Sequence, residues 1–370
     1  MSAGVGRTAL SKTQRIVVKV GTGVVADQDG QPSMERLTSL VQQIDVLRRA
    51  GKEVLLVSSG AIGVGAVRLG LQPHPTAVVD RQACAAAGQA ALVGLYASLF
   101  EPLGLTACQV LLTEDDFRSR RRYLNLAATL QRLLNLGAVP IINENDTVST
   151  AELALQGATV FGDNDRLSAL LASNLGADLL VLLTNVDGLY TAPPDEEQAQ
   201  RIATWQTQDV RLGSVSAGGR GGMEAKIEAA QVAVRSGVHV VIANGQKPQT
   251  LQRVLDGEDC GTWFPAGEGL NKRRQWLAFA TTPAGSLVVN EGARSAMVQR
   301  KASLLPPGVV GLQGSFEAGA VVSIVTESGE EFARGICGRA SREILPQSGT
   351  GERNRALVHR DHVVIFSEEQ

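Results

Sequence analysis

The sequence predicts an α/β protein with a parallel sheet covered on both faces, followed by a small β-rich barrel. In the first two-thirds of the chain, strand-like runs are aliphatic without polar alternation, and helix-like stretches separate them. After about Gly267 the pattern changes to short strands punctuated by turns. A length of 370 residues is sufficient for two domains of this kind.

Strand-like and helix-like stretches alternate along the first part of the chain. The expected strands are RIVVKV (15–20), EVLLVSSGA (53–61), TACQVLL (106–112), AVPIIN (138–143), DLLVLLT (178–184) and VHVVIANG (238–245). The expected helices cover residues 33–50, 77–100, 125–138, 165–177 and 225–237. Continuous apolar strands between helices are typical of parallel sheets buried on both faces.

The tail consists of short stretches rich in β-branched residues, with glycine turns between them. The expected strands are GSLVVNEGA (285–293), GVVGLQGSF (308–316), GAVVSIVTESG (319–329), EEFARGICG (330–338) and ALVHRDHVVIF (356–366). The polar, glycine-containing segment AGEGLNKRR (266–274) lies before them. We therefore expect a first domain over residues 1–268 and a second over 277–370.

Composition argues against several classes of protein. Lys and Arg number 35 and Asp and Glu 37, so a net charge of −2 gives no general attraction to nucleic acid. The four cysteines lie far apart without metal-ligand spacing, which favours reduced thiols in the cytoplasm. The N-terminus lacks a signal-peptide core, and no run of about 18 apolar residues occurs, so we expect a cytoplasmic protein without membrane spans.

Lys19 and the Gly-Thr-Gly that follows Val20 form the first candidate site. At the carboxyl end of a parallel strand, such a turn exposes backbone N–H groups, and a lysine beside them adds positive charge. This combination suits a phosphate, although neither a Walker loop nor a dinucleotide fingerprint is present. Taken alone, the stretch equally fits a strand-end turn with a lysine that extends to solvent.

Further stretches strengthen the phosphate interpretation. VSSGAIGVG (57–65) is a second strand-end turn, where Ser58 or Ser59 could cap the following helix and create an anion site. GGRGGMEAK (218–226) places four glycines before a helix that carries Lys226. NENDTVST (143–150) and FGDNDRLSA (161–169) add acidic and amide side chains at strand or helix ends: Asp146, Asp163, Asn164 and Asp165.

KVGTG, SSGAI, NENDTV, FGDND, LLTNVDGLYT and GGMEAK, in this order and spacing, resemble the glutamate 5-kinase family, which belongs to the amino-acid kinases. The similarity covers nearly the whole chain. From about residue 277, SLVVNEGA, SLLPPGV and FEAGAVVSI resemble the PUA domain that many of these enzymes carry. The resemblance implies an open, mainly parallel sheet between helical layers. It also implies ATP-dependent phosphorylation of the γ-carboxylate of L-glutamate to γ-glutamyl phosphate, the first step of proline biosynthesis.

The resemblance also implies roles for individual residues. Lys19 and Lys226 would stabilise the transferring phosphoryl group, and Asp165 would hold both lysines in place. Ser59, Asp146 and Asn164 match the glutamate-binding positions. The nucleotide-binding positions are matched by Lys19, Thr184, Asn185, Arg220, Gly221, Gly222, Met223, Glu224, Ala225 and Lys226. Mg²⁺ would accompany ATP with no metal ligand assigned in the protein, proline would be a feedback inhibitor, and the chain would form a homo-oligomer.

The chain departs from the family pattern on the nucleotide side. Asn185 stands where the family often has Asp, Arg220 where Thr is usual, and Ala225 where Thr is common. The reaction class does not depend on these positions. The glutamate carboxylate, with a free pKa of about 4.3, is already ionised at neutral pH and needs no general base.

Two alternatives remain beside this prediction. A kinase for another small acid, such as aspartate, acetylglutamate or carbamate, would share the fold and the phosphate loops. An RNA-binding protein is a different class, because PUA domains occur mainly in RNA-modifying enzymes. From Asn271 onward, twelve Lys or Arg face ten Asp or Glu, a net charge of about +2, which is weak for phosphate-driven binding. We therefore expect a structural or regulatory tail.

Overall fold

The computed structural model describes two parts of the chain, which divide into compact units at Met1–Gly269 and Leu270–Gln370. The described residues are 6–27, 29–72, 75–113, 116–117, 120–148, 164–192, 196, 198–205, 222–267, 283–344 and 356–366. Each unit has its own apolar core.

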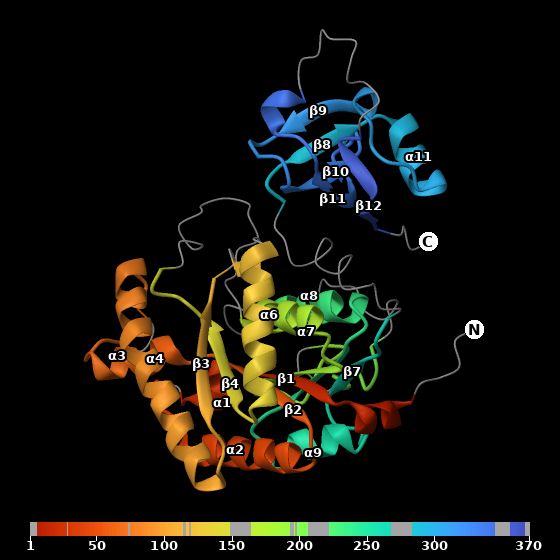
Figure 1. Cartoon of the computed structure of the whole chain (residues 1–370). Coiled ribbons are helices and arrows are strands. Elements are labelled where there is room, and N and C mark those ends of the chain that lie inside the picture. Colours follow the sequence, from red (N-terminus) through yellow and green to blue (C-terminus); the bar gives the residue numbers. More distant parts are fainter. Residues whose placement is uncertain are drawn as a thin grey trace. The chain divides into compact units, whose positions relative to one another are not determined.

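A seven-stranded sheet forms the centre of the first unit, in the order β3-β4-β2-β1-β5-β6-β7 (Figure 1). Its strands are β1 (Arg15–Val20), β2 (Glu53–Ser58), β3 (Ala107–Leu112), β4 (Val139–Glu144), β5 (Leu179–Thr184), β6 (His239–Asn244) and β7 (Thr262–Phe264). Every neighbouring pair is parallel except β6 and β7, which are antiparallel. The prediction of an open, mainly parallel sheet is confirmed.

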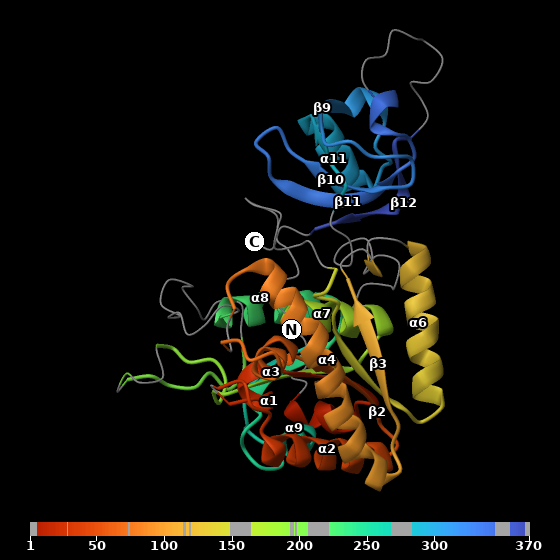
Figure 2. The same cartoon turned by 90° about the vertical axis from the view of Figure 1, so that its left-hand side faces the viewer.

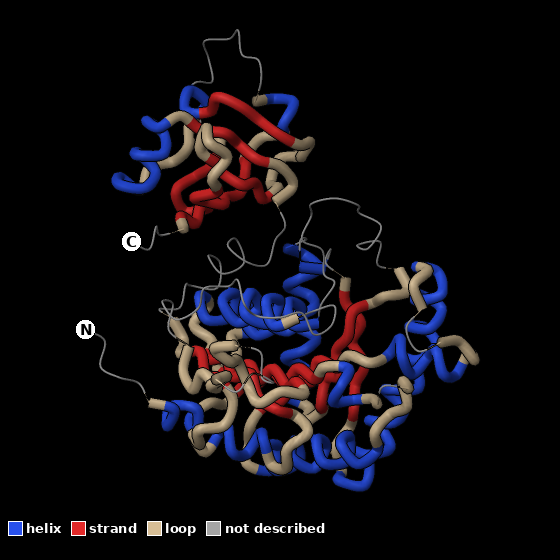
Figure 3. Tube along the Cα trace, turned by 180° about the vertical axis from the view of Figure 1, so that it is seen from behind, coloured by secondary structure: helices blue, strands red, loops and turns tan. Residues whose placement is uncertain are grey.

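Helices cover both faces of this sheet, as Figures 1 and 2 show and as the view from behind in Figure 3 repeats. The helices α2 (Met34–Arg49), α4 (Val78–Phe100) and α9 (Thr250–Leu255) share one apolar cluster with Ile16, Val18 and Val20. On the other face lie α6 (Arg120–Asn135), α7 (Asn164–Leu175) and α8 (Met223–Arg235). Because side chains alternate along a strand, Lys19 faces this second layer.

The strand order reverses beside β1. The backbone of Lys19 is in register with Val57 on β2 and with Leu182 on β5. The chain continues from β1 to β2 in one direction along the sheet and from β5 to β6 in the other. Open α/β sheets bind ligands at the carboxyl ends of the strands where such a reversal occurs. Lys19, the last but one residue of β1, lies at that place.

The predicted helices are present, with shifted ends. The helix expected at 125–138 is α6, and it begins at Arg120 because its apolar period continues back to buried Tyr123. The helix expected after the Ser58–Ser59 turn is α3 (Ala61–Arg68). Short elements were not expected: α1 (Thr22–Val25), α9, β7, and the 3₁₀ turns η1 (Arg7–Lys12) and η2 (Glu101–Leu103). Elements of this length contain too few residues for a periodic signal.

The second unit contains one five-stranded sheet in the order β12-β11-β10-β8-β9. Its strands are β8 (Ser286–Val289), β9 (Val309–Gln313), β10 (Val321–Val325), β11 (Glu331–Cys337) and β12 (Val358–Ile365), with 3₁₀ turns η5 (Pro306–Gly308) and η6 (Ser341–Glu343). The predicted strand 285–293 is too long, because Asn290 caps a helix, α11 (Glu291–Arg300). The Asn290 side chain accepts a hydrogen bond from the backbone N–H of Ala293.

Helix α4 is both long and apolar. The stretch Val78–Leu103 is long and apolar enough to cross a membrane by length and composition alone, with a mean hydropathy of 1.5. Its buried residues Leu92, Tyr96 and Phe100 belong to the core of the first unit. We therefore interpret α4 as a core helix of a globular domain, a class that also passes such a test.

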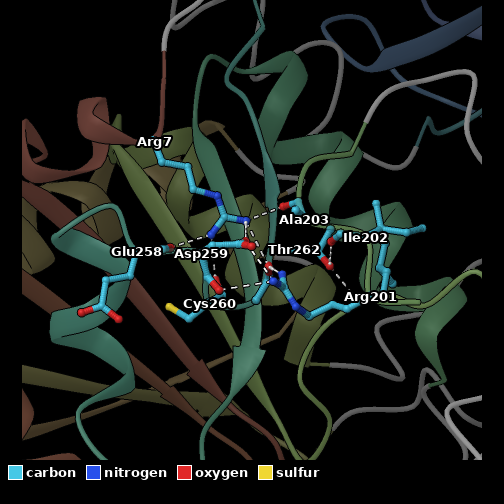
Figure 4. A network of polar contacts seen from close by, with 10 residues as sticks. Arg7, Arg201, Ile202, Ala203, Glu258, Asp259, Cys260 and Thr262 are labelled. Atoms are coloured by element: carbon cyan, nitrogen blue, oxygen red, sulfur yellow. Dashed lines mark hydrogen bonds and ion pairs between the residues drawn. The ribbon is translucent and has the colours of Figure 1, made fainter. Parts of the chain in front are cut away.

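Two guanidinium groups fix the segment that follows β5 (Figure 4). Arg7, from η1, donates hydrogen bonds to the carbonyl oxygens of Ala203, Glu258, Cys260 and Gly261. Arg201 bonds to Gly261, and both arginines pair with Asp259. The Thr262 hydroxyl accepts a hydrogen bond from the N–H of Leu189 at 2.8 Å. These contacts tie Leu189, Arg201 and Ala203 to the edge of the sheet beside β7.

Candidate active site

The turns after β1 and β2 lie side by side at the carboxyl edge of the sheet. The N–H of Gly21 bonds to the carbonyl of Leu183 on β5 at 3.1 Å, and the N–H of Ser59 bonds to the carbonyl of Val20 at 3.1 Å. These two amides therefore hold the strand ends together and are not available to a ligand. A Cβ atom at Gly21 would lie 3.9 Å from Lys19 Nζ, so Gly21 directly borders the ammonium group.

The expectation that Ser58 or Ser59 caps the next helix is wrong. The residue before α3 is Gly60, which has φ of 103° and gives no side-chain cap. Only glycine adopts this left-handed conformation without strain. The Ser58 hydroxyl instead shares a hydrogen bond of 2.9 Å with the Tyr96 hydroxyl in the core. The Ser59 hydroxyl remains at the sheet edge, where it accepts a bond from Asn164 Nδ2 at 2.9 Å.

Asp165 joins the two lysines that come from distant parts of the chain. Lys19 Nζ lies 2.7 Å from Asp165 Oδ1, and Lys226 Nζ lies 2.9 Å from Asp165 Oδ2. The carboxylate side chain is fully buried, whereas the side chains of Lys19 and Lys226 are 4% and 12% exposed. The three side chains therefore form one ionic cluster at the carboxyl end of β1.

Secondary structure explains the positions of these charges. Asp165 lies in the first turn of α7, where the partial positive charge of the helix N-terminus stabilises a carboxylate. Lys226 lies in the first turn of α8, where the same effect is unfavourable to a cation. Contact with Asp165 offsets that cost and directs the Lys226 ammonium group toward β1.

Burial by itself would raise the pKa of Asp165, because it removes water from the carboxylate. The nearby charges of Lys19 and Lys226, and their hydrogen bonds, act in the opposite direction and outweigh it. The pKa of Asp165 is therefore held below its ordinary value of 3.8. The carboxylate stays ionised throughout the neutral range.

A second group of side chains, all neutral, extends from the same edge. Asn164 Nδ2 donates to Ser59 Oγ and to Asn143 Oδ1, both at 2.9 Å. Asn143 Nδ2 in turn donates to Gln89 Oε1 at 2.8 Å. The group connects α7, the turn after β2, the end of β4 and helix α4. It brings Ser59 and Asn164, two expected glutamate-binding residues, into direct contact.

The remaining expected site residues occupy the ends of neighbouring elements. Asp146 lies in the turn directly after β4, two residues beyond Glu144. Thr184 ends β5, and its hydroxyl donates to Asn185 Oδ1 at 3.3 Å. Gly222 precedes α8, whose first residues are Met223, Glu224, Ala225 and Lys226. Arg220 and Gly221, and the aspartate at 163, lie outside the described residues.

Sequence reasoning missed Asn143 and Gln89. Asn143 is the first residue of the motif NENDTVST, from which only Asp146 was chosen, yet it is 3% exposed and faces Asn164. Gln89 lies in an alanine-rich helix and is 7% exposed. A single buried amide within an apolar helix is the signal that could have indicated a polar partner.

A cavity of ≈ 90 Å³ lies elsewhere, beyond the end of β6. It is lined by Asp187, Arg201, Ala243, Asn244, Lys247, Thr250, Arg253, Asp259, Cys260 and Gly261, none of them an expected site residue. Lys247 pairs with Asp187, Arg201 with Asp259, and Arg253 with Glu258 outside the lining. The Asp165 cluster differs, because there two cations share one buried carboxylate.

Two cationic side chains at the strand-order reversal of an open parallel sheet are typical of α/β enzymes that transfer phosphoryl groups. Residues 14–244 match the amino acid kinase family, and residues 285–354 match the PUA domain. The chain therefore belongs to the amino acid kinase family, here joined to a PUA domain.

Relatives similar over nearly the whole chain are glutamate 5-kinases. That of Gloeobacter violaceus is 44% identical, over 95% of this chain and 99% of its own length. Those of Geobacter sp. strain M21 and Myxococcus xanthus are 41% and 42% identical, over 96% and 99% of this chain and 99% and 100% of their own lengths. The solved UMP kinase from Bacillus anthracis is 18% identical, with a TM-score of 0.47 over 70% of this chain and 98% of that chain.

Asp165→Asn is expected to lower the free energy of unfolding at pH 7 by about 3–5 kcal/mol, because it leaves two buried ammonium groups without their carboxylate. A carboxyl with a lowered pKa stabilises the fold above its ordinary value of 3.8, and this contribution is lost as the pH falls through the lowered value. The difference between the two proteins should therefore shrink below pH 3.8. Urea unfolding followed by circular dichroism at pH 7 and pH 3 measures it.

Asp187→Asn is the matched control, because its partner Lys247 is half exposed. Exposed ion pairs contribute about 0–1 kcal/mol, so its effect should be small. Equal losses in the two variants at pH 7 would contradict the importance of burial at Asp165.

Proposed function

We propose that the protein phosphorylates the γ-carboxylate of L-glutamate with ATP, giving γ-glutamyl phosphate and ADP in the first step of proline biosynthesis. The observation that carries the proposal is the contact of Lys19 and Lys226 with one buried carboxylate at the carboxyl edge of the sheet. The choice of substrate rests on the glutamate 5-kinases that are similar over nearly the whole chain. These relatives do not favour aspartate, acetylglutamate or carbamate.

The arrangement of Lys19, Lys226 and Asp165 suits the neutralisation of phosphate charge. An anionic carboxylate must approach an anionic triphosphate, and phosphoryl transfer depends on positioning and on spreading that charge. Lys19, Lys226 and Asp165 together carry a net charge of +1, since two ammonium groups share one carboxylate. In a buried setting such a cluster favours an additional anion. The transferring phosphoryl group supplies that anion.

No general base is needed for the proposed reaction. A glutamate side chain has an ordinary pKa of about 4.3, so the attacking oxygen is ionised at neutral pH. Asp165 does not serve as a base either, because both of its oxygens contact ammonium groups. Its role is to position Lys19 and Lys226.

The two substrates are assigned to adjoining parts of the edge. Ser59, Asp146 and Asn164 would bind glutamate, with a carboxylate or carbonyl oxygen receiving the α-ammonium group. On the nucleotide side we place Thr184, Asn185 and the segment 220–226 before and within the start of α8. The hydrogen bond between Ser59 and Asn164 supports the first assignment, since both belong to one cluster.

We propose that Mg²⁺ accompanies ATP. Among the described residues, no group of three or more His, Cys, Asp or Glu side chains could hold a metal ion. Mg²⁺ in kinase sites is commonly held by nucleotide phosphates with few protein carboxylates. The described side chains therefore fit a metal that arrives with the nucleotide. When bound, it would neutralise phosphate charge beside Lys19 and Lys226.

For the rest of the chain we propose a catalytic domain over residues 1–268 and a PUA domain over 277–370 in a cytoplasmic enzyme. The four cysteines are free thiols, which supports a reducing compartment.

We assign the tail a structural or regulatory role because its net charge is small. Salt-dependent retention of RNA by the full chain would contradict that assignment.

The substitutions Lys19→Ala and Lys226→Ala should each reduce kcat by at least about a hundredfold, the effect of losing one electrostatic stabiliser. The assay mixes protein, ATP, Mg²⁺ and glutamate and traps the acyl phosphate as its hydroxamate. Added proline should lower the yield from the unaltered protein. Lys52→Ala is the control, because Lys52 lies before β2 and donates to the carbonyls of Ser11 and Thr13. Normal turnover by a folded Lys19→Ala variant would rule out the proposed mechanism.

Asp146→Asn should raise KM for glutamate about tenfold and leave KM for ATP unchanged, because it removes a charge-assisted contact to the α-ammonium group. Steady-state kinetics with each substrate varied in turn measures both constants. Asp256→Asn, at the end of α9, is the control. An unchanged glutamate KM in Asp146→Asn would show that the ammonium group binds elsewhere.

We also propose a homo-oligomer in which α4 contributes to the contact. The exposed side of α4 carries Val79 and the small residues Ala83, Ala86, Ala90, Gly94 and Ala97 at helical spacing, and the neighbouring edge strand β3 has no partner beyond it in the described sheet. Ala90→Glu should reduce the mass measured by light scattering. Ala50→Glu, at the end of α2, should not, and equal masses for all three proteins would contradict the proposal.

A further inference from the structure

We infer that Gln89 is a positioning residue: through Asn143 it holds the amide of Asn164 so that Asn164 Oδ1 faces the ammonium group of the substrate. The inference rests on the proposed function. It concerns three side chains that meet between α4, β4 and α7, and it assigns to Gln89 a role that its place in an apolar helix did not indicate.

A backbone contact identifies which end of the Asn143 amide is the oxygen. The N–H of Glu144 can only donate, and it lies 2.9 Å from Asn143 Oδ1. The reversed amide would place two donors against each other. Asn143 Nδ2 must therefore lie on the opposite side, where it donates to Gln89 Oε1 at 2.8 Å. This contact defines which end of the Gln89 amide faces Asn143.

The orientation of Asn164 follows from the same anchor. Asn143 Oδ1 accepts a second hydrogen bond at 2.9 Å, so the Asn164 group facing it must be the donor Nδ2. The other hydrogen of Nδ2 is directed to Ser59 Oγ, also at 2.9 Å. Both donor positions of Asn164 are thus occupied, and its carbonyl oxygen Oδ1 is turned away from Asn143 and Ser59.

Asn164 Oδ1 is buried and has no hydrogen-bond donor among the residues that the structure describes. A buried acceptor without a donor costs about 1–3 kcal/mol, so a ligand that brings a donor gains affinity there. At neutral pH the carboxylates of glutamate only accept hydrogen bonds, and its α-ammonium group is its single donor. The oriented amide therefore recognises the ammonium group.

Gln89 keeps this arrangement in place. Gln89 and Asn143 are 7% and 3% exposed, so water cannot readily replace a lost partner. Without the Gln89 oxygen, the buried Nδ2 of Asn143 would have to rotate toward another acceptor. That rotation withdraws Asn143 Oδ1 from Asn164, whose amide is then free to turn.

The test is Gln89→Met, which keeps the length of the side chain and removes the acceptor. KM for glutamate should rise about tenfold, equivalent to one hydrogen bond of about 1.4 kcal/mol, while KM for ATP stays within about twofold. Glutarate, which lacks the ammonium group, is used as a competitive inhibitor. Its inhibition constant should stay within about twofold, because the lost contact is one that glutarate never makes.

Tyr96→Phe is the matched control. It removes another buried hydrogen bond from α4, the one to Ser58, and should leave both KM values unchanged. If Gln89→Met is not obtained in folded form, Asn143→Leu interrupts the same set of bonds one step nearer to Asn164, and the same pattern is expected.

An unchanged glutamate KM in a folded variant overturns the inference, as do equal rises for glutamate and ATP or an equal weakening of glutarate. These outcomes leave the proposed function intact, because the unaltered protein would still phosphorylate glutamate. Absence of glutamate kinase activity in the unaltered protein would instead reject the proposed function itself.

Discussion

The ionised carboxylate of Asp165 is the constraint on which the rest of the site depends. A carboxylate cannot be removed from water at acceptable cost unless opposite charges surround it. Here those charges are the ammonium groups of Lys19 and Lys226. The first comes from the central strand β1 (Arg15–Val20). The second comes from the start of α8 (Met223–Arg235), which is far from β1 in the sequence. The cluster therefore forms only when β1, α7 and α8 are packed correctly, so folding and assembly of the site are one event.

The central strands of the fold could be predicted from the sequence, because nearly all of their residues lie in the same buried environment. All six residues of β5 are buried, and β1 is buried beyond Arg15, which is why aliphatic runs without alternation indicated central parallel strands. Helix caps and short elements could not be predicted from the hydrophobic pattern, because they depend on local backbone conformation and local hydrogen bonds. Gly60 replaces the expected serine cap, and Asn290 begins a helix inside an expected strand.

Less of the site than of the fold could be predicted from the sequence. Spacing along the chain placed Lys19 at a glycine turn, but nothing in it joined that turn to Lys226 or to Asp165. Their association was an implication of the family resemblance, and the distances belong to the structure. Gln89 and Asn143 were missed because a neutral amide has no charge pattern and no periodicity to mark it. Arg7 was missed for another reason: its acceptors are backbone carbonyls, which sequence does not distinguish.

The two halves of the proposed site differ in the kind of interaction that holds them. The phosphate half is ionic, and its central pKa lies below the ordinary value of a carboxyl group. The amino-acid half combines the proposed Asp146 carboxylate with a hydroxyl and several amides, and Gln89, Asn143, Asn164 and Ser59 do not titrate.

This difference determines how the site would respond to acid. The amides of Gln89, Asn143 and Asn164 keep their orientation at any pH at which the fold persists, because they gain or lose no proton. Free glutamate, with a side-chain pKa of about 4.3, becomes protonated before Asp165 does. Acid would therefore remove the attacking carboxylate first and the lysine cluster only afterwards. Recognition of the ammonium group is thus separated from the charges that drive phosphoryl transfer, and a change in Gln89 can alter substrate binding without disturbing the chemistry at Asp165.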